Sequence, residues 1–101
     1  MISLTAVVWT TTGCLFVLGL AMIVLRRKLL AMLLGLELML AAVNVSLVHH
    51  GGIFSDEQAL AVVALVIAVA AAEAVVGLAL ILRVRRAGGD ADTAELTELR
   101  G

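Results

Sequence analysis

Two glutamates lie deep inside long apolar stretches of this chain and are its strongest candidates for chemistry. Glu37 lies nine residues after Lys28, the nearest basic residue before it, and Glu73 lies ten residues before Arg83. If both stretches are helices that rise about 1.5 Å per residue, these separations correspond to roughly 13 and 15 Å. The two carboxyl groups are therefore expected near the middle of a bilayer, at nearly equal depth.

A carboxyl group at that depth is costly when charged, and the glutamate side chain is too short to reach the lipid headgroups. Each group must therefore be neutral, paired or hydrated from within the protein. Two such groups at matched depth suit a proton relay parallel to the membrane plane, and we predict this role for Glu37 and Glu73. Asn44, seven residues after Glu37, is a candidate for polar support. The alternative is that both glutamates stay protonated and only form hydrogen bonds between helices.

The composition requires a membrane around these residues. Of the 101 residues, 63% are hydrophobic, 15% are charged and none is proline, and the mean hydropathy is +1.19. A soluble domain this short could not bury so much apolar surface, and disordered chains are poor in apolar residues. The net charge of −1 argues against a nucleic-acid partner.

Three apolar stretches are each long enough to cross a hydrocarbon core of roughly 30 Å. They cover residues 2–25, 29–48 and 59–82. We therefore predict an all-α membrane protein with three transmembrane helices in up-down-up order, forming one domain over residues 1–86. We expect the second helix to end where residues 49–52 begin, and residues 49–58 to form a ten-residue connection.

Basic residues predict the orientation. Six of the seven lie at the helix ends that must share one side, namely Arg26, Arg27, Lys28, Arg83, Arg85 and Arg86. By the positive-inside rule that side is the cytoplasm, so the N-terminus and residues 49–58 are expected outside. Residues 87–101 then form a short acidic cytoplasmic tail.

Several short segments resemble one known family. They are GLELM at residues 35–39, AAEAVVGLA at 71–79, the pair Arg26 and Arg27 between the first two spans, and LRG at 99–101. With its three spans, the chain closely resembles the subunit K family of bacterial respiratory complex I, the proton-pumping NADH:quinone oxidoreductase. The resemblance covers essentially the whole chain. It implies proton-relay roles for Glu37 and Glu73, and a functional role for Arg26 and Arg27 in a cytoplasmic loop.

The resemblance also implies where the remaining chemistry occurs. FMN, the iron–sulfur clusters and quinone reduction belong to other subunits, and we expect no cofactor or metal site in this chain. The expected neighbours are the small subunits J and A and the antiporter-like subunit N, in the bacterial inner membrane. The chain departs from the usual family pattern at Lys28 and Ala41, where asparagine is common.

Two other functions compete with this interpretation. The first is the small subunit of a related multisubunit sodium/proton antiporter or membrane-bound hydrogenase, although the antiporter version usually lacks the glutamate equivalent to Glu37. The second is a non-catalytic membrane assembly protein, which would leave Glu37 and Glu73 unexplained.

The orientation can be tested by cysteine labelling in a variant that lacks Cys14. A cysteine introduced within residues 49–58 should react with a membrane-impermeant thiol reagent added outside intact cells, whereas a cysteine beside Gly88 should not. The reverse pattern would overturn the orientation.

Overall fold

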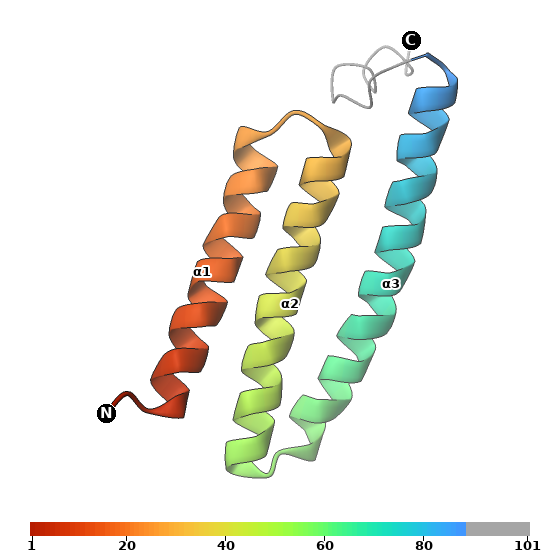
Figure 1. The fold of residues 1–101 in the computed structure, drawn as a ribbon. Helices are drawn as coiled ribbons and strands as arrows, with labels where there is room; N and C mark the ends of the chain where they lie inside the picture. Colours follow the sequence, from red (N-terminus) through yellow and green to blue (C-terminus); the bar gives the residue numbers. More distant parts are fainter. Residues whose placement is uncertain (89–101) are drawn as a thin grey trace.

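The computed structural model describes residues 1–88, which form three α-helices (Figure 1). Helix α1 runs over Leu4–Leu25, α2 over Leu29–Phe54 and α3 over Glu57–Arg86. All three are long and apolar enough to cross a membrane. The predicted all-α class with three membrane-spanning helices is confirmed. Residues 89–101 of the predicted acidic tail lie outside the described residues.

Helix α2 continues further than the sequence predicted. Residues 49–52 are helical and α2 ends at Phe54, so the expected helix end at His49 was wrong. The expected ten-residue connection was wrong as well, because only Ser55 and Asp56 separate α2 from α3. Glycine weakens a helix by only about 1 kcal/mol, and Gly51 is buried against the first turn of α3. A Cβ atom at Gly51 would lie 3.3 Å from Leu60.

The helix end is set instead by the two residues that follow it. Ser55 takes a left-handed conformation with φ 50°, and the N–H group of Asp56 donates to the carbonyl oxygen of Gly51 at 3.0 Å. This is the bonding pattern of a Schellman helix end. The Asp56 carboxylate then accepts from the amides of Gln58 and Ala59 and so begins α3 directly.

Helix α2 lies between α1 and α3 and packs against both (Figure 1). The chain begins at the end where Ser55 and Asp56 join α2 to α3, which we call the connection end. The other end carries the two basic clusters, at residues 26–28 and 83–86, and we call it the arginine end. Both clusters therefore lie at one end of the helices.

Small residues that are seven positions apart on each helix let α1 and α2 pack closely. Gly19 and Gly35 meet backbone to backbone, since a Cβ atom on Gly35 would lie 2.5 Å from the Gly19 carbonyl oxygen. Seven residues away on each helix, Thr12 and Ala42 are both buried, with 4% and 2% of their surface exposed. Such residues let membrane helices approach closely, where dispersion forces replace the hydrophobic effect as the cause of association.

A different contact holds α2 and α3 together near the arginine end. Ile81 and Val84 of α3 are buried, and Leu29 and Leu33 of α2 pack against them. Leu33 also fills the space beside Gly77, where a Cβ atom would lie 2.8 Å from a Leu33 methyl carbon. Most other apolar side chains of the three helices are exposed, so they must face lipid or other proteins.

The glycine contact between α1 and α2 predicts a graded response to alanine. Gly19→Ala and Gly35→Ala should each destabilise the protein by about 1–3 kcal/mol, because the new methyl group meets immovable backbone. Gly77→Ala should cost less, because the methyl groups of Leu33 can rotate away. The readout is the midpoint of thermal aggregation of the chain in detergent extracts of its native membranes.

Two glycines in the same helices serve as controls. A Cβ atom at Gly13 or Gly52 meets nothing within 4 Å, so Gly13→Ala and Gly52→Ala should be neutral or slightly stabilising. Losses of stability in Gly13→Ala and Gly52→Ala equal to those in Gly19→Ala and Gly35→Ala would mean that α1 and α2 do not cross at Gly19 and Gly35.

Candidate functional site

Glu37 lies on the face of α2 that packs against α3. The same face carries Leu33, which contacts Gly77, and Gly51, which contacts Leu60. Successive steps of three and four residues connect these two contacts, and such steps keep side chains on one helix face. The residues on this face are Leu33, Glu37, Leu40, Asn44, Leu47 and Gly51. Two of the predicted polar residues, Glu37 and Asn44, therefore face α3.

Glu73 lies on the face of α3 that packs against α2. That face consists of residues that are buried or half-buried and that follow the same helical spacing: Ala59, Val63, Val66, Ala70, Glu73, Gly77, Ile81 and Val84. The neighbouring Val75 and Val76 point away, with 69% and 68% of their surface exposed. Glu73 thus points from α3 toward α2.

The contact between Leu33 and Gly77 sets the level of both glutamates. Because α2 and α3 run antiparallel, the step from Leu33 to Glu37 and the step from Gly77 back to Glu73 lead in the same direction. Each step is four residues, or about 6 Å along the helix. Glu37 and Glu73 therefore lie opposite each other, one turn from this contact, which agrees with the equal depth expected from the sequence.

Three buried side-chain oxygens have no hydrogen-bond partner among the described residues. They are Oε1 of Glu37, Oδ1 of Asn44 and Oε2 of Glu73, and all three belong to the interface of α2 and α3. Buried polar atoms are nearly always paired, and leaving one unpaired costs about 1–3 kcal/mol. These oxygens are therefore available to water or to a neighbouring protein.

Arg26 and Arg27 are separate from this cluster. Both lie in the short connection between α1 and α2 and are exposed at the arginine end. The backbone N–H group of Arg26 ends α1 by donating to Met22. The structure therefore brings Glu37, Asn44 and Glu73 together along one interface, and it leaves the two arginines outside it.

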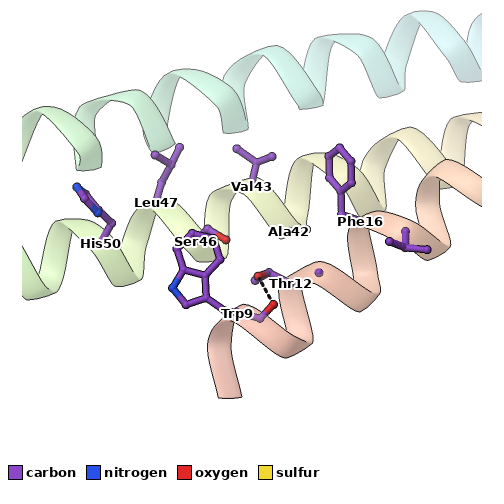
Figure 2. Close-up of a pocket in the computed structure, with 10 residues that line it drawn as sticks. Trp9, Thr12, Phe16, Ala42, Val43, Ser46, Leu47 and His50 are labelled. Carbon is purple, nitrogen blue, oxygen red and sulfur yellow. Dashed lines mark hydrogen bonds between the residues drawn. The ribbon is translucent and has the colours of Figure 1, made fainter. Parts of the chain in front are cut away.

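A groove of about 580 Å³ lies between α1 and α2, and no residue pattern in the sequence indicates it (Figure 2). Its lining is mostly apolar and includes Trp9 and Phe16 of α1 and Val43 and Leu47 of α2, and Leu47 lies at the border between this groove and the face toward α3. None of the three unpaired oxygens belongs to a residue that lines it. The groove depends on small residues opposite large ones, a property of helix register that a sequence pattern does not display.

The described residues offer no alternative site built on a metal. Within residues 1–88 no group of three or more His, Cys, Asp or Glu residues is placed to hold a metal ion. The single cysteine, Cys14, is exposed on α1. The interface of α2 and α3, which holds the three unpaired oxygens, is the candidate site.

Known proteins resemble the chain over nearly its whole length. Residues 7–101 match the family described as NADH-ubiquinone/plastoquinone oxidoreductase chain 4L. The chain is 45% identical to the NADH-quinone oxidoreductase subunit K of Persephonella marina over 89 residues, which cover 88% of this chain and 89% of that protein. It is 41% identical to the subunit of the same name from a Sulfurihydrogenibium species over 90 residues, covering 89% of this chain and 90% of that one.

Proposed function

Since the chain belongs to the NADH-ubiquinone/plastoquinone oxidoreductase chain 4L family, we propose that it contributes Glu37 and Glu73 to a proton relay in the membrane arm of that complex. The chain is a multi-pass membrane subunit of NADH-quinone oxidoreductase. In this proposal the relay runs parallel to the membrane plane, from one helix of the subunit to the next.

The observation that carries the proposal is the placement of two carboxyl groups opposite each other, each with an unpaired buried oxygen. A protonated carboxyl group donates a hydrogen bond and an ionised one accepts, so the pair can exchange a proton. Helix axes lie about 8–10 Å apart at such contacts, a gap that two glutamate side chains and one water molecule can span.

The partners and the orientation complete the proposal. FMN, the iron–sulfur clusters and the quinone site are assigned to partner subunits, and subunits J, A and N are the proposed neighbours in the bacterial inner membrane. The arginine end faces the cytoplasm, where Arg26 and Arg27 contact either lipid headgroups or a partner subunit. Relatives named as oxidoreductase subunits favour this function over the small antiporter subunit.

The two carboxyl groups should differ in sensitivity. Glu37 lies between Leu33 and Leu40 on its face, whereas Glu73 lies one turn from Ala70, whose small side chain leaves water more room to replace the carboxyl group. Glu37→Gln should leave assembly intact and reduce NADH-driven proton uptake and quinone reduction by about tenfold or more. Glu37→Asp should retain part of both activities, and Glu73→Gln should cause a milder loss.

The measurements use membrane vesicles that contain equal amounts of assembled complex. Glu57→Gln is the matched control, because Glu57 is exposed in the first turn of α3 at the connection end and should not affect proton uptake. Full pumping by Glu37→Gln would show that this carboxyl group is only a structural hydrogen-bonding group.

A further inference from the structure

Beyond the two glutamates, the interface of α2 and α3 has a polar side chain only toward the connection end. From the level of the two glutamates to the arginine end, the packed residues are aliphatic or glycine: Leu29, Leu33, Gly77, Ile81 and Val84. Leu33 fills the space beside Gly77, so this side leaves little room for water. Toward the connection end the interface contains one more polar side chain, that of Asn44.

Asn44 has no partner on the helix that it faces. It lies two turns from Glu37, about 10 Å along α2, and the α3 residues opposite this part of α2 are Val63 and Val66. Neither valine side chain can form a hydrogen bond, and Oδ1 of Asn44 is buried without a partner among the described residues. An amide that is forced into this position and left unpaired would be destabilising.

On the Asn44 side of the glutamates, Leu40 of α2 lies opposite a small residue of α3. Ala70 is one turn from Glu73 toward the connection end and is only half-buried. Its side chain is a single methyl group, in contrast to Leu33 and Ile81 on the other side. A carboxamide both accepts through its oxygen and donates through its nitrogen, so Asn44 can join two water molecules in line without taking a proton itself.

We propose that Asn44 is a positioning residue that holds water in the interface of α2 and α3, and that proton exchange with Glu37 and Glu73 passes Asn44 toward the connection end. This inference rests on the proposed function. The aliphatic residues on the other side keep water from reaching the two glutamates from the arginine end. Within this subunit, protons therefore reach the glutamates only from the connection end.

The test replaces Asn44 in the assembled complex with side chains that differ in hydrogen bonding. Asn44→Leu and Asn44→Ala remove the amide, and each should lower NADH-driven proton uptake by about fivefold, as expected for the loss of one hydrogen bond. Each should also raise the solvent deuterium isotope effect on quinone reduction, because proton transfer then limits turnover. Asn44→Ser keeps a hydroxyl group that donates and accepts, and it should restore most of the activity and a normal isotope effect.

Ser46→Ala is the matched control. Ser46 is also an uncharged polar residue of α2, but it lines the groove between α1 and α2 (Figure 2), so its loss should change neither readout. Alanine and serine side chains are both smaller than that of asparagine. Comparing Asn44→Ala with Asn44→Ser therefore separates hydrogen bonding from size, even if Asn44→Leu fails to assemble.

Two results would overturn the inference. The first is normal proton uptake with a normal isotope effect in Asn44→Ala. The second is an Asn44→Ser variant as impaired as Asn44→Ala, which would mean that side-chain size and not hydrogen bonding matters. Glu37→Gln, measured in parallel, separates the two proposals. If it pumps fully the relay itself fails, whereas if it is impaired while Asn44→Ala is normal only the role of Asn44 fails.

Discussion

A carboxyl group in the middle of a bilayer must have a hydrogen-bond partner, and the way in which α2 and α3 face each other reflects that constraint. Glu37 and Glu73 both turn away from lipid into the interface of α2 and α3. There the contact between Leu33 and Gly77 places them at one level. An oxygen of each carboxyl group is still unpaired among residues 1–88, so this part of the subunit does not by itself satisfy its buried polar groups. A site of this kind is complete only with water or with the other subunits of the oxidoreductase.

Helix α2 can serve as the middle helix because its two opposite faces differ in chemistry. The face toward α1 carries Gly35 and Ala42, which permit backbone contact and contain no polar side-chain atom. The face toward α3 carries Glu37 and Asn44. Close packing on the face toward α1 holds α2 against α1. The face toward α3 holds the polar groups of α2 away from lipid. The groove between α1 and α2 lies apart from those polar groups (Figure 2).

Much of this could be predicted from the sequence, because hydrophobic length and charge position are local properties. Three spans, the depth of Glu37 and Glu73 and the grouping of basic residues at one end required only helix rise and counting. The end of α2 could not be predicted, because Gly51 and Gly52 indicate a break that packing against α3 overrides. The facing of Asn44 toward α3 and the meeting of Gly19 with Gly35 depend on helix register. Register is set by contacts between distant residues, which one sequence does not display.

Cysteine cross-linking in the assembled complex shows whether Glu37 and Glu73 face each other across α2 and α3. In a Cys14→Ala background, the pair Glu37→Cys and Glu73→Cys should be joined by a short bifunctional thiol reagent, detected after cleavage at a protease site inserted between Ser55 and Asp56. The pair Glu37→Cys and Val76→Cys should not be joined, because Val76 points away from α2. Cross-linking of the second pair without the first would contradict the facing arrangement.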